Sequence, residues 1–327
     1  MKDFRTELFP RPAATPIKTT DQVLTIGSCF ADAIGRRLTE NKFRVCQNPF
    51  GTLYHPHAIH RALGMSIDNE MPGRETYVSN DGLEANYLFH SSCSSPQLST
   101  LDAKIKETLA ATHTFLKSTD FLLITYGTAW VHELKPSGLL VSNCHKMPAG
   151  HFSKRLLTLN EIHSSFAQFQ ATLKSFNPRC RVILTVSPVR HLKETLEGNA
   201  ASKSLLRYAC HQLVSTFSDV VYFPAYEIQL DDLRDYRFYQ TDRLHPTDEA
   251  VDYIWEKFTD TFLDEPARQW IQRWQAIQKS LNHRGLHPAS HRHREFLQSV
   301  LQQMQALNAP FDLSDEMARL QSAIQNS

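Results

Sequence analysis

The chain has 327 residues, of which 41% are hydrophobic and 21% are charged, values typical of an ordinary soluble globular protein. This length supports one large core, or one core with an appendage. The 35 Lys and Arg residues nearly balance the 34 Asp and Glu residues, so the formal net charge is +1 at pH 7 and no cluster of basic residues indicates nucleic-acid binding.

The amino terminus, the length of the apolar segments and the cysteines also limit the class of protein. The amino terminus, MKDFRTELFPRPAATPIKTTD, carries charges and prolines where a signal peptide has an apolar stretch. No segment approaches 18 uninterrupted apolar residues, so we expect no membrane span and no membrane partner. The cysteines are scattered, without a C-x-x-C pair: Cys29, Cys46, Cys93, Cys144, Cys180 and Cys210. This usage favours reduced thiols in a cytoplasmic protein over a disulfide framework.

Short apolar runs predict the strands. They are VLTIG (23–27), FRVC (43–46), FLLITYG (121–127), RVILTVS (181–187) and VVYFP (220–224). Each run is continuous rather than alternating, which is typical of strands buried on both faces. Helix-like stretches alternate with them, near 30–40, 55–65, 101–117, 158–176 and 201–216. This alternation predicts a parallel sheet covered by helices on both faces and built by right-handed crossovers.

Two stretches interrupt the alternation of strand and helix. Residues 66–100 and 128–157 contain turn signals such as Asn80-Asp81-Gly82 and Pro136-Ser137-Gly138. We expect loops or hairpins above the sheet, where binding surfaces usually form.

The pattern changes after about residue 264. Apolar residues keep helical spacing in two groups: Trp270, Trp274 and Ile277, then Leu297, Leu301, Met304 and Leu307. The polar segment NHRGLHPASHRHR separates the two groups. We therefore expect a main domain over residues 1–263 and a helical carboxy-terminal extension over residues 264–327. The extension would pack on the main domain or on another subunit, in which case the protein is a homo-oligomer.

Ser28 follows the first predicted strand, within the stretch LTIGSCFADAIGRRL (24–38), where the chain enters a helix. The amino terminus of a helix presents unpaired N–H groups and a partial positive charge, which suit a developing oxyanion. A serine there is also a common N-cap, and the motif is not the G-x-S-x-G elbow of the α/β-hydrolases. By itself, the position of Ser28 favours capping.

The segment FYQTDRLHP (238–246) supplies possible partners for this serine. Asp242 and His245 are three residues apart, so both side chains can point the same way in a tight turn. Asp242 could then hold one imidazole nitrogen while the other faces Ser28. An exposed D-x-x-H in a loop is common by chance, but together with the serine it favours a Ser-His-Asp triad.

Several blocks of the sequence resemble the GSCFA-domain family, which is similar to the SGNH/GDSL hydrolases. These blocks are GSCFA (27–31), NPFG (48–51), TYGTAWV (125–131), NCHK (143–146), TVSPVRH (185–191) and DYRFYQTDRLHP (235–246). The resemblance covers about residues 20–262 and leaves the extension outside it. It implies a three-layer α/β/α sandwich with a five-stranded parallel sheet in the order 2-1-3-4-5. In such a sheet the ligand crevice opens where strands 1 and 3 end, which is where Ser28 and Gly127 fall.

The resemblance also implies an oxyanion hole. In SGNH hydrolases the donors are the serine N–H, a glycine N–H from a second block and an asparagine side chain from a third. Gly51 matches the glycine, but the third block reads Gly127-Thr128-Ala129, so an alanine stands in place of the amide. Asn143 could bring an amide back to this place, or Thr128 could donate instead.

Further residues of these blocks are candidates for substrate binding. His145, close to Asn143 in the sequence, could contact the substrate or support the loop over residues 224–245. Arg190 and His191 follow the fourth strand and could bind a polar substrate, or Arg190 could pair with a nearby carboxylate.

Cys29 is the rival nucleophile. A thiol at the amino terminus of a helix has its ionised form favoured, yet cysteine is more often a small buried hydrophobe. One residue from Ser28, the thiol should also point elsewhere, so we favour the serine.

Two groups of histidines invite a metal-binding interpretation. They are His55, His57 and His60, and then His283, His287, His291 and His293. No acidic residue or cysteine is tightly interleaved with the first group, and the second lies in a polar linker. We favour surface or capping roles and expect neither a metal nor a cofactor.

Together these features predict a serine-dependent ester hydrolase. Ser28 would attack the ester carbonyl, His245 would transfer the proton, and Asp242 would orient the imidazole, so that water resolves an acyl-enzyme. By analogy with the related hydrolases, the first candidate substrate is a small acyl ester on a carbohydrate. Two alternatives stay open: an O-acyltransferase with the same triad, and a carbohydrate- or partner-binding protein with a weakened oxyanion hole.

Overall fold

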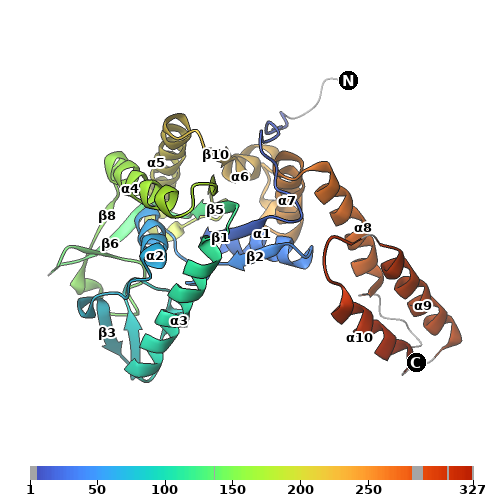
Figure 1. Ribbon diagram of the computed structural model, residues 1–327. Coiled ribbons are helices and arrows are strands. Elements are labelled where there is room, and N and C mark those ends of the chain that lie inside the picture. Colours follow the sequence, from blue (N-terminus) through green and yellow to red (C-terminus); the bar gives the residue numbers. More distant parts are fainter. Residues whose placement is uncertain (1–5, 136, 282–289, 308, 326–327) are drawn as a thin grey trace.

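A five-stranded parallel sheet forms the centre of the molecule (Figure 1). The computed structural model describes residues 6–135, 137–281, 290–307 and 309–325. Across the sheet the strands are β2 (Arg44–Gln47), β1 (Gln22–Gly27), β5 (Phe121–Tyr126), β9 (Arg181–Val186) and β10 (Val220–Phe223). All neighbouring pairs are parallel. Numbered along the chain within this sheet, the order is 2-1-3-4-5, and the predicted fold class is confirmed.

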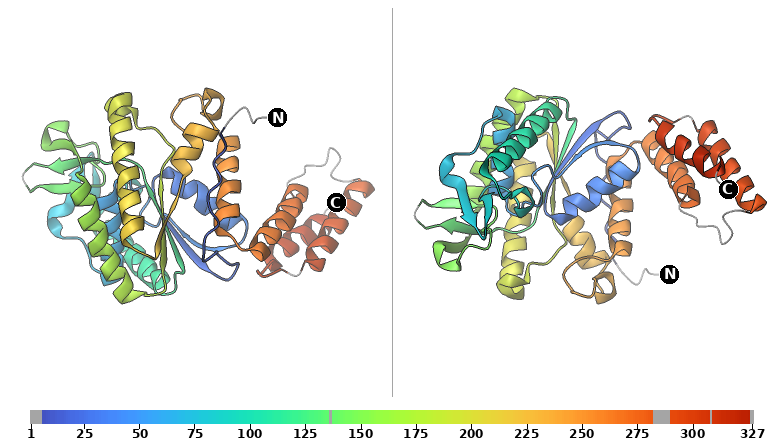
Figure 2. Two further views of the ribbon diagram at one scale, coloured as in Figure 1. Left: turned by 90° about the horizontal axis from the view of Figure 1, so that it is seen from above. Right: turned by 90° about the horizontal axis from the view of Figure 1, so that it is seen from below.

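Helices cover both faces of the sheet, as Figure 2 shows. One face carries α2 (Pro56–Asp68), α3 (Leu98–Leu116), α4 (Leu159–Phe176) and α5 (Thr195–Thr216). The other face carries α1 (Cys29–Glu40) and α7 (Asp248–Phe262). The side chains of β5 show why this strand is buried on both faces: Leu122 and Ile124 enter the first core, whereas Phe121 and Leu123 enter the second.

Two antiparallel excursions stand beside the parallel sheet. The first is the hairpin of β3 (Tyr77–Asn80) and β4 (Leu83–Asn86), and the second is the three-stranded sheet of β7 (Leu139–Val141), β6 (Trp130–Leu134) and β8 (Phe152–Leu156). In the hairpin, Asp81 and Gly82 have φ angles of 52° and 71°, as a two-residue primed turn requires. The turn predicted at Asn80-Asp81-Gly82 is confirmed. In the second predicted turn, Pro136 lies outside the described residues.

Several short helical turns complete the connections. They are η1 (Arg74–Thr76), η2 (Ser91–Cys93), η3 (Ala149–His151), η4 (Leu192–Glu194), α6 (Ala225–Glu227), η5 (Ile228–Asp232) and η6 (Tyr236–Phe238). The last three lie in the connection between β10 and α7, which carries the Asp242 and His245 segment.

In the described part of the carboxy-terminal extension, three helices project to one side of the sheet (Figure 1). They are α8 (Glu265–Leu281), α9 (His291–Ala306) and α10 (Ser314–Gln325). The indole N–H of Trp270 donates to the carbonyl oxygen of Asn41 and that of Trp274 to the carbonyl oxygen of Glu40, both at 2.8 Å. The two buried indoles stack with ring centroids 5.6 Å apart. The extension thus packs on the end of α1 in its own chain, and an oligomer stays a prediction.

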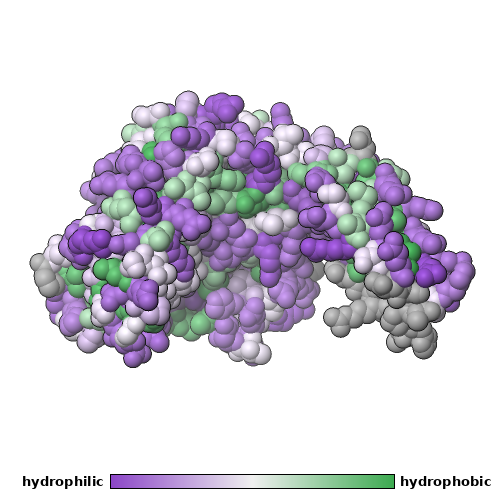
Figure 3. Space-filling model, turned by 60° about the horizontal axis from the view of Figure 1, so that its bottom comes forward, coloured by the Kyte–Doolittle hydropathy of each residue, from purple (hydrophilic) through white to green (hydrophobic). Residues whose placement is uncertain are grey.

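Polar side chains dominate the molecular surface seen in Figure 3, where apolar side chains occur in separate groups. None of the helices built from described residues is long and apolar enough to cross a bilayer. All six cysteines fall within the described residues, and each is a free thiol.

Candidate active site

Ser28 lies at the edge of the sheet where the parallel strands end, which we call the carboxyl edge. Its backbone N–H donates to the carbonyl oxygen of Thr125 at 3.1 Å, and its Oγ accepts from the N–H of Phe30 at 3.3 Å. Gly27 has a φ of 137°, and a Cβ atom at this position would stand 2.1 Å from the Thr125 oxygen. Only glycine therefore allows this close approach to β5. The side chain of Ser28 caps α1 and is fully buried.

Asp242 and His245 form a hydrogen-bonded pair. Oδ2 of Asp242 lies 2.6 Å from Nδ1 of His245, and Oδ1 accepts from the N–H groups of Leu244 and His245 at 2.8 and 3.0 Å. The bond from the imidazole, followed by the two backbone bonds, lowers the pKa of Asp242 to about 2. Within the described residues, Nε2 of His245 makes no hydrogen bond. The pair has the arrangement of a general base and the carboxylate that orients it.

The loop that carries this pair is held to the carboxyl edge by Arg190, which follows β9. The N–H of Arg190 donates to the carbonyl oxygen of Leu244 at 3.2 Å. Its guanidinium lies over the ring of Tyr239 at 4.1 Å and over that of Tyr236 at 5.3 Å. Arg190 thus positions the loop by stacking on two aromatic rings, and the loop returns to the edge where Ser28 lies.

His191 connects this loop with the end of β5. Its ring meets the ring of Tyr54 edge-on, with centroids 5.3 Å apart, and its Nε2 would stand 3.3 Å from a Cβ atom on Gly127. Burial, followed by the positive charges of Lys203 and His245, lowers the pKa of His191 to about 4. These contacts bring the end of β5 and the loop of His245 to one region. No hydrogen bond joins Ser28 to His245 in the described part of the chain, and the triad stays a prediction.

The backbone groups expected in the oxyanion hole are bonded to other groups in this structure. The N–H of Gly51 donates to the carbonyl oxygen of Asn48 at 2.8 Å, and the N–H groups of Gly127 and Thr128 donate to that of Tyr54 at 2.7 and 3.1 Å. The hydroxyl of Thr128 lies 3.0 Å from the hydroxyl of Ser202. An oxyanion would have to replace one of these bonds or find another donor, so the predicted oxyanion roles stay untested.

Asn143 and His145 lie in the second excursion and support the first. The side-chain oxygen of Asn143 accepts from the N–H of His145 at 2.8 Å. Nε2 of His145 lies 2.8 Å from the carbonyl oxygen of Asn86, and the side chain of Asn80 donates to the carbonyl oxygen of His145 at 2.9 Å. These bonds tie the segment after β7 to the β3–β4 hairpin. A role in substrate binding stays a prediction for both residues.

Two further residues belong to the region and were not singled out from the sequence. Lys203 of α5 is buried, and its ammonium group donates to the carbonyl oxygens of Gly127 and Ser187 at 2.6 and 2.7 Å. Burial lowers the pKa of Lys203 to about 7. Asn48 accepts from the N–H of Gly27 at 2.8 Å. No local pattern distinguishes Lys203 from a solvent-exposed helical lysine, whereas Asn48 could have been found as the first residue of NPFG.

Cys29 has an environment that disfavours a thiolate. Burial, followed by the negative charge of Asp32, raises the pKa of its thiol above the usual value. These effects outweigh the favourable position at the amino terminus of α1. The neutral thiol is a poor nucleophile, which supports the preference for Ser28.

In the first histidine group, the expected capping role is confirmed for His55, whereas the expected surface or capping role is wrong for His60, which packs in the core. His55 caps α2, accepting at Nδ1 from the N–H of Ala58, while its Nε2 lies 3.1 Å from the carbonyl oxygen of Val141. His60 is buried in the core, with Nε2 2.7 Å from the hydroxyl of Tyr126. In the second group, His283 and His287 lie outside the described residues. Among the residues that the structure describes, no three His, Cys, Asp or Glu side chains form a cluster that could hold a metal ion.

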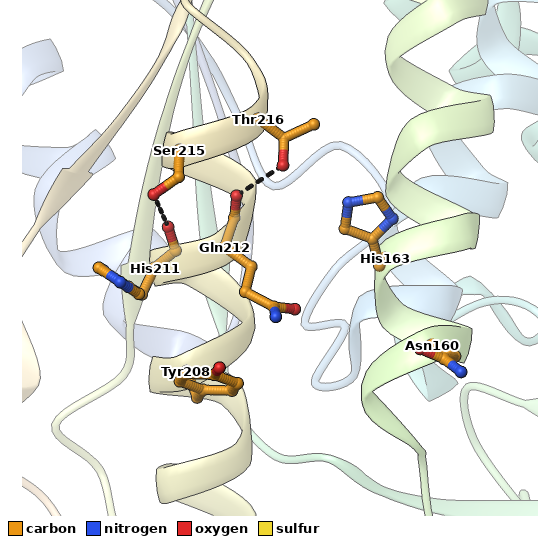
Figure 4. A pocket seen from close by; sticks show the side chains of 7 residues that line it. All are labelled: Asn160, His163, Tyr208, His211, Gln212, Ser215 and Thr216. Carbon is orange, nitrogen blue, oxygen red and sulfur yellow. Dashed lines mark hydrogen bonds between the residues drawn. The ribbon is translucent and has the colours of Figure 1, made fainter.

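A polar hollow of about 500 Å³ lies between α4 and α5 (Figure 4). Its lining residues are Asn160, His163, Tyr208, His211, Gln212, Ser215 and Thr216. The hydroxyls of Ser215 and Thr216 donate to backbone oxygens of α5 itself, as the dashed lines in Figure 4 show. None of the lining residues is a predicted site residue, so the hollow is separate from the candidate active site.

Two family models together match most of the chain. Residues 22–258 match the model of the GSCFA family, and residues 274–326 match the model of the C-terminal domain of GSCFA domain proteins. The first match confirms the expected range of the resemblance, and the second shows that the extension matches a separate model found in GSCFA domain proteins. No curated protein matches the chain.

Solved structures give weaker likenesses. A protein from Streptococcus pneumonia described as a platelet activating factor is 11% identical, with 74% of this chain and 83% of that chain covered and a TM-score of 0.40. A carbohydrate esterase family 3 protein from Talaromyces cellulolyticus is also 11% identical, with 79% and 99% covered and a TM-score of 0.35. Scores this low carry no argument about the function of the chain.

Proposed function

The chain belongs to the GSCFA family, and we propose that it is an ester hydrolase with Ser28 as nucleophile, His245 as general base and Asp242 as the orienting carboxylate. The observation that carries the proposal is the 2.6 Å bond between Asp242 and His245. It leaves Nε2 of the imidazole available on a loop at the carboxyl edge, where Ser28 begins α1.

The reaction follows from the chemistry of these groups. As Oγ of Ser28 attacks the ester carbonyl, its proton moves to Nε2 of His245. Asp242, whose pKa of about 2 keeps it ionised at neutral pH, holds the Nδ1–H and stabilises the imidazolium. The proton then passes to the leaving alcohol as the carbon–oxygen bond breaks, and a covalent acyl-serine remains. Water resolves the acyl-serine by the same steps in reverse.

The burial of Ser28 limits the substrate. Its exposed fraction is 0%, so side chains at the carboxyl edge must move before an ester carbonyl can reach Oγ. A nucleophile enclosed in this way favours a small acyl group. Within the loop of His245, Tyr236 is 60% exposed, and the guanidinium of Arg190 lies over its ring. An exposed aromatic ring offers an apolar face with a polar tip, which suits a carbohydrate as the alcohol component of the ester.

A fluorophosphonate probe tests the proposal, because it phosphonylates only an activated serine. We expect mass spectrometry to find the label on Ser28 of the wild type, no label in Ser28→Ala, and hydrolysis of p-nitrophenyl acetate lost in the same variant. Ser153→Ala is the matched control, since Ser153 is exposed on β8, and it should label as the wild type does. A wild type that neither labels nor hydrolyses the ester would overturn the proposal.

The engaged N–H groups and the buried serine favour a second candidate, a carbohydrate-binding protein of the same fold without turnover. The same assay separates the two candidates, because a binding protein leaves the probe unreacted. An O-acyltransferase would label at Ser28, and adding sugar acceptors to the acyl-enzyme would then yield acylated sugar in place of free acid.

A further inference from the structure

We infer that Asn48 supplies the side-chain amide of the oxyanion hole, the donor that Ala129 cannot provide. The inference rests on the proposed function. Asn48 is the first residue of the NPFG block and directly follows β2, so it lies beside the end of β1 rather than after β5.

The backbone of Asn48 fixes its place next to the nucleophile. Its N–H donates to the carbonyl oxygen of Thr25, and its carbonyl oxygen accepts from the N–H of Gly51, both at 2.8 Å. The residue has a φ of 37°, in the left-handed region that asparagine tolerates better than most residues. Asn48 therefore occupies one defined position beside the last residue of β1.

The orientation of the carboxamide follows from its partner. Oδ1 accepts from the N–H of Gly27 at 2.8 Å. Because a backbone N–H can only donate, the amide oxygen must face Gly27, and the reversed assignment would set two donors against each other. The carboxamide is thereby anchored to the residue that precedes Ser28, and its Nδ2 faces away from that anchor.

Nδ2 of Asn48 is buried and has no hydrogen-bond partner among the residues that the structure describes, and the whole residue is only 8% exposed. Buried amide donors are nearly always paired, and an unpaired one requires an explanation. Ser28 beside it is buried as well. A movement that admits an ester to Ser28 would bring a carbonyl oxygen to the region of this donor, whose N–H would then stabilise the developing negative charge.

The other candidates for this amide are already engaged. The hydroxyl of Thr128 bonds to that of Ser202, and the side-chain oxygen of Asn143 is held by the N–H of His145 in the second excursion. The carboxamide of Asn48, in contrast, bonds directly to the backbone beside Ser28.

Two substitutions separate a role of Asn48 in the oxyanion hole from a purely structural role. Asn48→Asp keeps an oxygen for the N–H of Gly27 but removes the amide donor. Asn48→Gly removes the whole side chain without introducing a charge, and glycine accepts the positive φ. Asn177→Asp is the matched control, because Asn177 is also buried and donates through Nδ2 to the carbonyl oxygens of Leu116 and Thr119, outside the site.

The experiment measures kcat and KM for p-nitrophenyl acetate, the rate of fluorophosphonate labelling of Ser28, and thermal unfolding. We expect both Asn48 variants to lose about 10²–10³-fold in kcat and in labelling rate, with KM changed by less than about fivefold. Asn177→Asp should keep its kcat even where its Tm falls. A wild-type kcat in a folded Asn48→Asp or Asn48→Gly variant would overturn the inference. If Ser28 is still labelled in the same experiment, the proposed function stands. A wild type that does not label overturns both.

Discussion

Nζ of Lys203 lies 2.6 Å from the carbonyl oxygen of Gly127, which directly follows β5, the strand beside β1. A second bond of 2.7 Å joins the same ammonium group to the carbonyl oxygen of Ser187. One side chain of α5 therefore links the ends of β5 and β9 at the carboxyl edge. Lys203 is only 1% exposed, and no ion pair to it occurs in the described part of the chain. The ammonium group thus joins the two strand ends through carbonyl oxygens, and it also lies over the ring of Tyr226, 5.8 Å from the centroid.

Replacing Lys203 should change how stability depends on pH. Burial lowers its pKa from 10.5 to about 7 in the folded protein. Between pH 7 and 10.5 the unfolded chain binds more protons than the folded one, so this group makes the free energy of unfolding rise with pH in that window. We expect Lys203→Met to lose this rise. Because the substitution leaves two carbonyl groups unpaired, it should also lower the free energy of unfolding by about 2–4 kcal/mol.

Urea unfolding at several pH values from 6 to 9 measures this effect. Lys106→Met, at an exposed position of α3, should keep the pH dependence of the wild type. Parallel curves for the wild type and Lys203→Met above pH 7 would contradict the lowered pKa.

Asp242→Asn should inactivate the protein without unfolding it. The amide cannot hold His245 in the tautomer that presents an unprotonated Nε2, and loss of that function costs about 10⁴-fold in kcat in a comparable triad. Asp242 is half exposed, so the thermal midpoint should hardly change. Asp231→Asn, which breaks an exposed pair with Arg234, is the control and should keep its activity. A near-normal rate in Asp242→Asn would mean that another group orients His245.

The buried histidine His55 should make the protein sensitive to acid. Burial lowers its pKa from 6.5 to about 3, so between these values the unfolded chain binds the extra proton. The contribution of His55 to stability is therefore complete above pH 6.5 and is lost as the pH falls towards 3. Asn is also a good N-cap for α2. We therefore expect the free energy of unfolding of His55→Asn to fall less steeply as the pH is lowered. Free energies of unfolding at pH 4–7 test this, with the exposed His151→Asn as control. An unchanged slope would refute the assignment.

Trp270→Phe should loosen the extension. The indole N–H of Trp270 donates to the carbonyl oxygen of Asn41 in a buried contact. Phenylalanine would leave that oxygen unpaired and would destabilise the docked extension by about 1–3 kcal/mol. We expect faster release of the extension in limited proteolysis, while hydrolysis of p-nitrophenyl acetate stays at the wild-type rate. Trp130→Phe, which removes a similar bond to Gly198 far from the extension, should leave the release rate unchanged.

Much of the fold could be predicted because its signals are local. The run FLLITY of β5 is buried at every position, and its apolar side chains alternate between the two cores. The runs of β1 and β9 are similar. The turn at Asp81 and Gly82 could be located because these residues tolerate positive φ. The docking of Trp270 on Asn41 could not be predicted, because the partners are 229 residues apart and one of them is a backbone oxygen.

The same division holds for the candidate site. The sequence alone determined that Asp242 can reach His245, because a three-residue separation within one tight loop fixes that geometry locally. Only the tertiary structure decided that Ser202 engages Thr128 across 74 residues and that Lys203 joins two strand ends. It also decided that Oδ1 of Asn48 bonds to Gly27 while Nδ2 finds no partner among the described residues. The physical reason is that backbone geometry over a few residues governs short-range hydrogen bonds. The packing of helices and strands determines which distant donors and acceptors meet, and no local pattern in the sequence records it.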